Sequence, residues 1–531
     1  MQVNLHVSEK KNILIFCVVL LLQCFVIIAW GTQKERMHVD EMFTMEGIKK
    51  EGASMRYWDL EEDFYGTEHN KKEFLERMTV NEDDLIIKKG IIYVVESLLH
   101  EELYYTFINL LSSISLGHIP WAICVGFNLV CFLVTQVILY GIVKEDFGDI
   151  SALLTTAIYG FSAGGISTVL YARCYMMLIM LEMLLIYAFH RFIKSQKKWQ
   201  RILYIICSEV LAFFSYRTHQ FGMILFLLTT GLAVLYMLIK KNWNLLLWLG
   251  AGYGIPCLLG YKIIWNRIRA FFVSGVAPTF YHNLTDTPIS WRITYMKELL
   301  NTVAEHMFCN MWIMLLIFAL ICYYLIRIKI WRTDSALKEK TVILATIIIV
   351  VFYGLMLILG GAIAWRYISP MYPFIAVLLG VMVSMACTDI SIPKSVKSAI
   401  LSMIICIPLI SYGVHRVSEM YTGEEALRQE LEAHYQGVNG IMVHHDLQGD
   451  GENYLYEAAT LWPEESNVLV LQHHMLEKGL FEYRNDDKIL LWLTADFDRE
   501  ESIEFFKKCT DYADIRPILN TEHVWVYECN K

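Results

Sequence analysis

The sequence predicts a polytopic α-helical membrane protein that ends in a soluble α/β domain. Of its 531 residues, 56% are hydrophobic and only 19% are charged, and the mean hydropathy is +0.42. An ordinary soluble protein does not need this much apolar surface to fill its cores. The formal net charge of −9 is spread over both signs. Nucleic acid is therefore not an expected partner, because proteins that bind it usually carry a basic face.

Apolar runs set the expected number of membrane spans. A span needs about 20 apolar residues, and we predict about 11 transmembrane helices. They cover residues 12–30, 119–143, 151–170, 173–190, 202–215, 220–239, 244–264, 310–328, 341–360, 369–387 and 398–413. No small-residue cleavage site follows the first run, so we expect a retained anchor rather than a removed signal peptide.

Lysine and arginine collect in alternate loops, and this asymmetry predicts the orientation. The basic loops lie near residues 144, 191–201, 240–241, 327–340 and 394–397. With these loops and the N-terminus in the cytoplasm, segment 31–118, loop 265–309 and the tail face the extracytoplasmic side. We therefore expect a multi-pass protein of the cell (plasma) membrane with an extracytoplasmic C-terminal domain.

The two long polar regions differ in pattern. Segment 31–118 contains "GIIYVVESLLHEELYYTFINLL", whose apolar residues recur at helical spacing. The tail alternates short apolar runs, "GIMVHH", "NVLVLQ", "KILLWLTA" and "HVWVYEC", with helix-like stretches such as "REESIEFFKKC". The predicted domains are a transmembrane domain at 1–414, which includes loop 31–118, and an extracytoplasmic soluble α/β domain at 415–531.

A polar cluster follows the first span directly. His38, Asp40 and Glu41 stand together in "HVDE". A short helix beginning near Asp40 would hold two carboxylates beside the membrane surface, where a lipid head group can reach them. Glu41 could orient an acceptor or bind a divalent cation, and neighbouring carboxylates can raise one another's pKa and so tune a base.

Together with three later motifs, this pair resembles bacterial membrane glycosyltransferases of the GT-C superfamily, related to protein O-mannosyltransferases and the aminoarabinose transferase. Those relatives carry an Asp-Glu pair in the first outer loop. "LYARCYMML" at 170–178 is similar to their Ala-Arg-x-Tyr motif, and "YRTHQFG" at 216–222 to their Thr-His-Tyr motif. "WRYISPMYPFIAVLLG" at 365–380 is similar to their Arg-Tyr…Pro…Pro pattern. The match covers roughly the first 390 residues, and every motif falls on the outer face of the predicted topology.

The resemblance implies a GT-C fold and an inverting sugar transfer from a polyprenyl phosphate, with Asp40 as the general base. The acceptor would be an envelope glycan, lipid or protein on the extracytoplasmic side. Two positions depart from the family pattern. Val169, Leu170 and Tyr171 stand where many relatives have an acidic residue or a Gln-Glu pair, and Gln220 replaces the aromatic residue after His219.

Sugar transfer from a lipid phosphate needs a base for the acceptor proton and cations for the departing phosphate. Asp40 suits the base. Arginine suits phosphate because its planar fork matches the phosphate oxygens. The candidates for donor phosphate and sugar are Arg173, Tyr175, Arg217, His219, Arg366 and Tyr367. A divalent cation, Mg²⁺ or Mn²⁺, is a candidate cofactor with Glu41 as its ligand. The tail lacks a GxGxxG or P-loop pattern, so no nucleotide cofactor is expected.

Each assignment has a structural alternative. An acidic pair after a membrane helix is commonly a solvated helix start, and arginines at span ends commonly anchor to lipid phosphates. His219 alone suits an interhelical hydrogen bond, and tyrosines at span ends suit an aromatic belt.

Two other function classes stay open. A lipid or glycolipid transporter or flippase would show charges at mid-span depth and paired broken helices. Glu182 and Glu209 are the clearest charged residues in the spans, and Gly160, Gly164 and Gly165 could break the third span. No matching segment in the second half is evident from the sequence. A non-catalytic envelope protein whose outer domain binds partners is the third class.

Overall fold

The fold was analysed in a computed structural model of the chain. The described residues are 2–34, 37–49, 64–90, 103–259, 283, 285–328, 336–361, 363–389, 395, 402, 406–407, 410, 424–444, 451–479, 486–494, 498–521 and 524–531. The chain divides into a helical unit of residues 1–32 and 125–417 and a sheet unit of residues 33–124 and 418–531.

The sheet unit contains the segment after the first span as well as the tail. The predicted domains instead placed loop 31–118 with the transmembrane domain. Strand β1 (Glu68–Asn70) from that segment pairs antiparallel with β3 (Asn467–Gln472) from the tail. The reason is backbone chemistry, since the open edge of a sheet accepts a strand of almost any sequence through its N–H and C=O groups.

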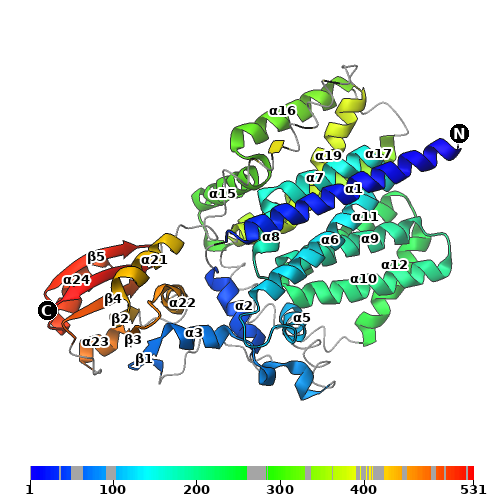
Figure 1. The fold of residues 1–531 in the computed structure, drawn as a ribbon. Coiled ribbons are helices and arrows are strands. Elements are labelled where there is room, and N and C mark those ends of the chain that lie inside the picture. The colour runs from blue at the N-terminus through cyan, green and yellow to red at the C-terminus, as the bar shows by residue number, and fades with distance from the viewer. Residues whose placement is uncertain are drawn as a thin grey trace. The chain divides into compact units, whose positions relative to one another are not determined.

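Helices build the helical unit, and most of them are long and apolar. They are α1 (Gln2–Gly31), α6 (Trp121–Phe147), α7 (Asp149–Phe161), α8 (Ala163–Leu170), α9 (Tyr175–Lys194), α10 (Lys198–Thr218), α11 (Gln220–Ile239), α12 (Trp243–Leu259), α15 (Ile289–Phe308), α16 (Met311–Ile328), α17 (Ala336–Gly360), α18 (Trp365–Ile368) and α19 (Tyr372–Asp389). Ten of the predicted spans fall on these helices, and the span at 398–413 lies largely outside the described residues. Helices α9, α10, α11 and α12 pack side by side (Figure 1).

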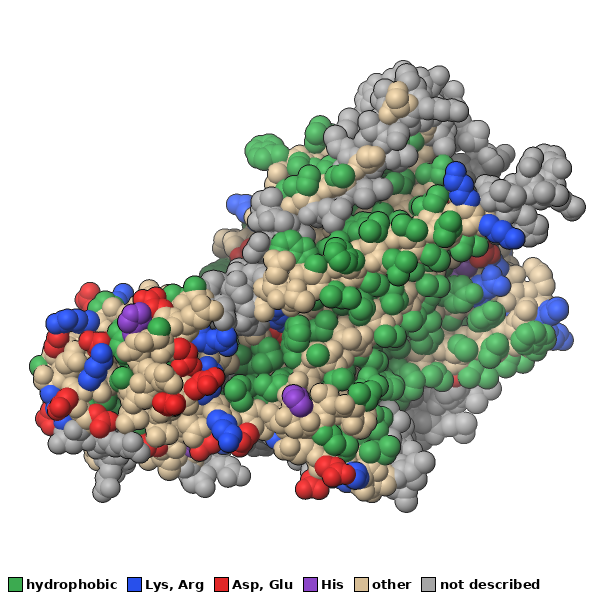
Figure 2. Space-filling view, in the orientation of Figure 1, with side chains coloured by type: hydrophobic (Ala, Val, Ile, Leu, Met, Phe, Trp, Pro, Cys, Tyr) green, Lys and Arg blue, Asp and Glu red, His purple; other side chains and the backbone are tan. Residues whose placement is uncertain are grey.

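The helical unit has the surface of a membrane protein. Within the described residues, five helices are long and apolar enough to cross a bilayer, or up to seven if each bent helix pair is one span. The length and composition of the described helices therefore do not confirm the predicted count of about 11 transmembrane helices. Apolar side chains cover much of the visible face of this unit, and charged side chains are prominent on the sheet unit (Figure 2). The chain is a multi-pass membrane protein.

Two helix pairs are sharply bent. The predicted span at 151–170 is divided into α7 and α8, which meet at 56°. Ser162 caps α8 because its hydroxyl accepts a hydrogen bond from the Gly165 N–H at 2.9 Å. The second pair, α15 and the first part of α16, is bent by 82°. The break falls where the predicted loop 265–309 meets the predicted span 310–328, but a helix before it was not predicted.

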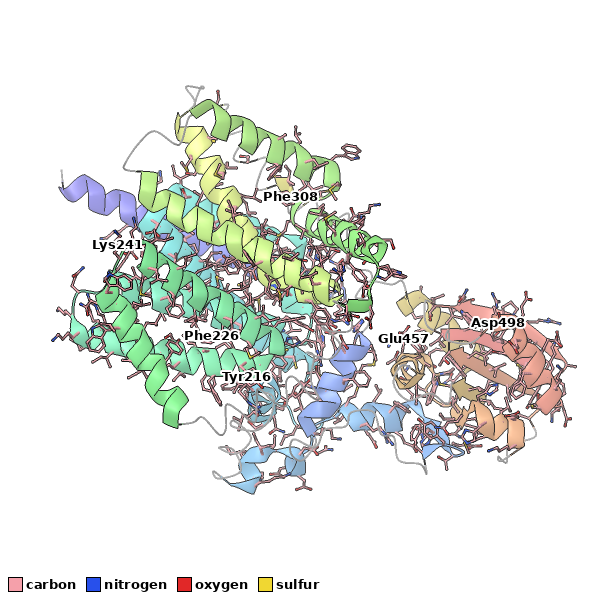
Figure 3. The ribbon with its side chains drawn as sticks, turned by 180° about the vertical axis from the view of Figure 1, so that it is seen from behind. Tyr216, Phe226, Lys241, Phe308, Glu457 and Asp498 are labelled. Carbon is pink, nitrogen blue, oxygen red and sulfur yellow. The ribbon has the colours of Figure 1, made fainter. Side chains whose placement is uncertain are left out.

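Close packing holds the helical unit together. Leu185, Phe189, Met237 and Leu249 belong to a buried cluster between α9, α11 and α12, and Phe226 packs against it from α11. Figure 3 labels Phe226 on α11 and Tyr216 near the end of α10. The candidate site residues Tyr175, Arg217 and His219 lie at the ends of α9, α10 and α11.

Within its described residues, the sheet unit contains six strands in the order β1-β3-β2-β4-β6-β5. Besides β1 and β3 they are β2 (Gly440–His444), β4 (Lys488–Thr494), β5 (Asp514–Asn520) and β6 (Val524–Asn530), and the helices of the tail are α21 (Glu424–Tyr435), α22 (Gly451–Leu461), α23 (His473–Lys478) and α24 (Arg499–Cys509). β3, β2 and β4 are parallel, whereas β1, β6 and β5 each pair antiparallel with a neighbour. The four apolar runs predicted as strands correspond to β2, β3, β4 and β6, which confirms the α/β tail. β1 and β5 were not predicted.

Both faces of the sheet are buried. One face packs against α23 and α24 in a cluster that includes Leu471, Leu491 and Phe506. α22 contacts β2, β4 and β6, and the buried Trp462 follows directly after it. Because side chains alternate between the faces, burial on both explains why β4 is a continuous apolar run, "ILLWL".

The rest of the sheet unit comes from the segment after the first span. It contains α2 (Val39–Lys49), α3 (Lys71–Met78), α5 (Leu103–Ser112) and the short 3-10 helices η2 (Glu82–Asp84) and η3 (Ile86–Lys89). Buried Asn109 on α5 connects α2, η2 and η3 through hydrogen bonds. Its Nδ2 donates to the carbonyls of Ile48 and Asp84 at 2.8 Å each, and its Oδ1 accepts from the Ile86 N–H at 2.9 Å. The predicted helix near residues 90–111 is confirmed from Leu103, and residues 91–102 lie outside the described part.

Candidate active site

The "HVDE" segment forms the start of α2, as predicted. The Asp40 N–H donates to Nδ1 of His38 at 3.1 Å, and the His38 N–H donates to the Glu41 carboxylate at 2.8 Å. This reciprocal pattern satisfies N–H groups at the beginning of a helix that have no partner inside it. His38 and Glu41 therefore fix where α2 begins.

Glu41 is buried and forms an ion pair with Lys34. The Lys34 Nζ lies 2.5 Å and 2.6 Å from the two Glu41 carboxylate oxygens. The exposed fraction of the Lys34 side chain is 3% and that of Glu41 is 0%. Burial lowers the pKa of Lys34, and the charge of Glu41 and its hydrogen bond oppose this shift. Lys34 also lies over the Trp121 ring, 5.3 Å from its centroid.

Asp40 has a different environment from its neighbour. Its side chain is 22% exposed, and one carboxylate oxygen lies 3.8 Å from Nδ1 of His38. A partly exposed carboxylate beside an imidazole can accept a proton from a molecule that reaches it from outside. The two adjacent acids are therefore not equivalent, because Asp40 is accessible and Glu41 is enclosed.

The predicted cation site at Glu41 does not fit this geometry, since an ammonium already occupies both carboxylate oxygens. Among the described residues, no group of three or more His, Cys, Asp or Glu side chains is placed to hold a metal ion.

In the helical unit, Arg173 lies in the turn that joins α8 to α9. The Arg173 N–H donates to the carbonyl of Tyr171 at 2.7 Å. Buried Asn128 of α6 donates to that same carbonyl at 2.8 Å and to the carbonyl of Val169 at 3.3 Å. This turn is therefore held by a side chain from a neighbouring helix, and it delivers Tyr175 as the first residue of α9.

His219 lies at the reversal between α10 and α11. Its Nδ1 accepts a hydrogen bond from the Phe221 N–H at 3.2 Å, so the imidazole caps α11. The reversal is tight, because a Cβ on Gly222 would lie 2.2 Å from the carbonyl oxygen of Ser215. Arg217 stands in the last turn of α10, where it is half-buried.

The short helix α18 carries Arg366 and Tyr367. The hydroxyl of buried Tyr353, on α17, donates to the carbonyl of Tyr367 at 2.9 Å. The Arg366 guanidinium lies 5.1 Å from the centroid of the Tyr367 ring. Hydrogen bonding to the backbone and contact with an aromatic face both restrict where this arginine can point.

Three predicted residues from three separate motifs come together. The ring centroids of Tyr175 and His219 are 5.3 Å apart, those of Tyr175 and Tyr367 are 6.0 Å apart, and those of His219 and Tyr367 are 6.2 Å apart. We call these three residues the aromatic triad. Arg173 lies two residues before Tyr175 in the chain, and the Arg366 guanidinium lies over the ring of Tyr367. The Nε atoms of Arg173, Arg217 and Arg366 are shielded from solvent.

Other aromatic residues extend the triad, and sequence reasoning did not assign them to the site. Tyr171 stacks on Tyr175 at 6.1 Å and meets Trp365 edge-on at 5.1 Å. His306 of α15 lies 5.8 Å from Trp365, and its Nδ1 is 2.8 Å from the Tyr372 hydroxyl. Tyr171 and Trp365 lie within two of the predicted motifs, which was an available signal. His306 had none, because nothing near it in the chain marks a site.

The predicted residues thus form two groups in different units. His38, Asp40 and Glu41 belong to the sheet unit, and the arginines and the triad belong to the helical unit. The first group offers one accessible carboxylate. The second offers aromatic faces, an imidazole and guanidinium groups, which suit a sugar and a phosphate.

Comparisons with known proteins agree with the predicted resemblance at the level of fold. No protein-family model and no curated protein matches the chain. ArnT from Cupriavidus metallidurans bound to undecaprenyl phosphate matches with a TM-score of 0.50 at 13% identity, over 97% of this chain and 97% of that chain. The apo ArnT structure matches with a TM-score of 0.50 at 13% identity, over 98% of each chain. The chain therefore has an ArnT-like membrane fold.

Proposed function

We propose that this multi-pass membrane protein with an ArnT-like fold transfers a sugar from a polyprenyl-phosphate donor to an extracytoplasmic acceptor. The observation that carries the proposal is the aromatic triad, which brings together Tyr175, His219 and Tyr367 from three distant motifs. Aromatic rings, an imidazole and nearby guanidinium groups are the side chains that suit a sugar and its phosphate. Support also comes from ArnT, whose structure holds undecaprenyl phosphate.

The arginines are assigned to the donor phosphate. As the bond from the sugar to the phosphate breaks, negative charge grows on the phosphate oxygens, and fixed guanidinium groups stabilise it. Arg173 and Arg366 fit this role because each lies on a segment tied by a hydrogen bond to a neighbouring helix. Arg217 is the third candidate. The triad offers rings for the sugar and, in His219, a donor for phosphate.

Asp40 is assigned to the acceptor. In a single displacement, the acceptor oxygen forms a bond to the anomeric carbon while the bond from that carbon to the phosphate oxygen breaks. The acceptor proton passes to the Asp40 carboxylate, the polyprenyl phosphate leaves, and the configuration inverts. The partial exposure of Asp40 fits a group that meets an external hydroxyl.

The proposed setting is the cell membrane, with the N-terminus in the cytoplasm and the candidate residues on the extracytoplasmic side. The distribution of lysine and arginine over the loops supports this orientation. The acceptor is an envelope glycan, lipid or protein. The donor reaches the site from the bilayer, which agrees with the apolar surface of the helical unit.

The test is transfer of radiolabelled sugar by the purified protein in lipid, from a panel of synthetic polyprenyl-phosphate sugars, with water as acceptor when no other is known. We expect label to be released from one donor by the wild type and not by Asp40→Asn, which keeps the shape of the side chain. Release that persists in a folded Asp40→Asn variant would remove Asp40 as the base. A broad panel with no donor consumed would remove the enzyme proposal.

Lipid translocation is the second candidate, because the structure has two sharply bent helix pairs and a buried carboxyl group in Glu182. Thr229 donates to Glu182 at 2.5 Å. The purified protein in lipid vesicles distinguishes the two candidates. Translocation of a fluorescent polyprenyl-phosphate analogue without sugar release would favour a flippase.

A further inference from the structure

We infer that Lys34 and Glu41 form a positioning clamp for Asp40, and that Glu41 takes no direct part in sugar transfer. The inference rests on the proposed function for the role of Asp40. It assigns a task to Lys34, which no motif marked, and separates the tasks of two adjacent acids that the sequence treats alike.

The first argument is burial. Both Lys34–Glu41 side chains are removed from solvent, and two Nζ–O distances of 2.5 Å and 2.6 Å show contact with both carboxylate oxygens. Enclosing two charges carries a large desolvation cost, so a buried pair is a poor source of stability. In several proteins such a pair instead fixes one arrangement of the chain.

The second argument is the number of contacts that meet at Glu41. Its carboxylate accepts from the Lys34 ammonium and also from the His38 N–H at 2.8 Å. One side chain therefore ties the approach to α2 and its first turn together. Successive helical residues point about 100° apart, since a turn contains 3.6 residues. With Glu41 held inside, Asp40 must point to another side, where it is partly exposed.

The third argument is the surroundings of Lys34. Its ammonium lies over the Trp121 ring, 5.3 Å from the ring centroid. Trp121 comes from the far end of the same unit's N-terminal segment, residues 33–124. The clamp thus ties the residues after the first span to those around Trp121, and it determines where α2 begins.

The chemistry of Glu41 follows from the same contacts. A carboxylate bound to an ammonium through both oxygens cannot take an acceptor proton without losing its partner. A divalent cation beside the ammonium would be repelled by it. Asp40 carries the proton transfer in this arrangement, and Glu41 holds it in place.

The kinetic test compares Glu41→Gln and Lys34→Met with the wild type, using the radiolabelled donor. Glu41→Gln keeps the size of the side chain and removes the charge. We expect kcat to fall about 100-fold in either variant, as for a misplaced catalytic group, with the donor KM unchanged. The charge-reversed double variant Lys34→Glu/Glu41→Lys should recover part of kcat. Glu41→Gln with kcat close to that of the wild type would overturn the clamp.

A matched control comes from an exposed ion pair in the same unit, Lys88 with Glu82, whose side chains are 55% and 64% exposed. Exposed pairs contribute little, so Lys88→Met should leave kcat unchanged. An equal loss in Lys88→Met would show that any charge removed from this unit lowers activity, and would overturn the specific role of Lys34.

A second measurement does not depend on activity. The Asp40→Cys variant is labelled with a maleimide and the rate at position 40 is followed by peptide mass spectrometry, with and without Glu41→Gln. We expect Glu41→Gln to change that rate several-fold, and an unchanged rate would overturn the clamp. If the rate responds while the wild type transfers no sugar, the clamp holds and the proposed function fails. If the wild type transfers sugar while Glu41→Gln changes neither kcat nor labelling, the function holds and the clamp fails.

Discussion

The side chain of Asn128 donates a hydrogen bond to the carbonyl of Tyr171 at 2.8 Å, across an interval of 43 residues. Asn128 is fully buried on α6, and the carbonyl belongs to the turn that carries Arg173. An amide inside a membrane bundle is costly unless it is bonded, so this contact specifies the position of the turn. A candidate phosphate ligand is thus held by a helix that has no part in the motif itself.

Asn128→Ala should loosen the turn at 171–174. The variant loses the hydrogen bonds to the carbonyls of Tyr171 and Val169, and the Tyr171 carbonyl keeps only the bond from the Arg173 N–H. The expected destabilisation is about 1–3 kcal/mol. We also expect weaker donor binding, because Arg173 is less fixed. Thermal unfolding in detergent and the donor KM measure the two effects. An unchanged KM in a destabilised variant would separate the turn from donor binding.

Replacing Arg366 by Lys should weaken binding of the donor, although the positive charge is kept. The Arg366 guanidinium lies against the Tyr367 ring at 5.1 Å, and a lysine offers neither the planar fork nor this stacking. We expect donor affinity and kcat to fall in Arg366→Lys, with a further fall in Arg366→Met. Arg327, at the opposite end of the predicted topology, supplies the control, since Arg327→Lys should leave both quantities unchanged.

Gly380 on α19 allows close packing with α7. A Cβ at this position would lie 2.3 Å from Oγ1, 2.7 Å from N and 2.8 Å from Cα of Thr155. Backbone atoms cannot move aside easily, so Gly380→Ala should destabilise the protein by about 1–3 kcal/mol. Gly231→Ala on α11 is the matched control, because no atom lies within 4 Å of its added Cβ. Equal unfolding temperatures for the two variants would contradict the packing argument.

Phe74 fastens the segment that contributes β1. Its ring meets Trp462 edge-on at 5.3 Å and Phe64 at 5.8 Å. Phe74→Ala should cost about 3–5 kcal/mol and make residues 64–78 accessible to protease while the tail strands stay protected. Lys72→Ala, at a side chain that is 84% exposed, should leave the cleavage pattern unchanged. Simultaneous cleavage of both parts in Phe74→Ala would show that they unfold as one.

The lowered pKa of Glu528 predicts that the protein loses stability in acid. The hydrogen bond from Lys488 lowers the pKa of Glu528 from its ordinary 4.5 to about 2, with Asn530 contributing. Because the folded pKa lies below the unfolded one, the stabilisation is present above about pH 4.5 and is lost as the pH falls through about 2. The difference in unfolding free energy between the wild type and Glu528→Gln should shrink over that window. A constant difference would rule out this linkage.

Local features could be predicted where spacing alone decides them. A bilayer requires about 20 apolar residues per helix, and ten predicted spans fall on helices of the structure. The tail helix at Arg499–Cys509 and the strand at Lys488–Thr494 also follow from pattern. The individual members of the aromatic triad were predicted from three motifs, because residue types that suit a sugar phosphate are few.

Partners far apart in the chain could not be predicted in the same way. The pairing of Glu68–Asn70 with Asn467–Gln472 uses backbone groups that almost every residue carries. The side chains therefore do not indicate it. The glycines at 160, 164 and 165 did indicate that the span at 151–170 could break, and the 56° bend confirms this. Its position at Ser162 depends on the cap that this side chain provides. Likewise, "DE" alone cannot tell which acid is enclosed.

The sequence by itself determined a multi-pass helical protein with an α/β tail and a short set of candidate residues, because hydrophobic length, strand alternation and side-chain chemistry are local properties. Only the tertiary structure decided that Lys34 encloses Glu41 and leaves Asp40 accessible. It also decided that Tyr175, His219 and Tyr367 share one site. Burial and proximity depend on how the whole chain packs, and no single stretch of residues contains that information.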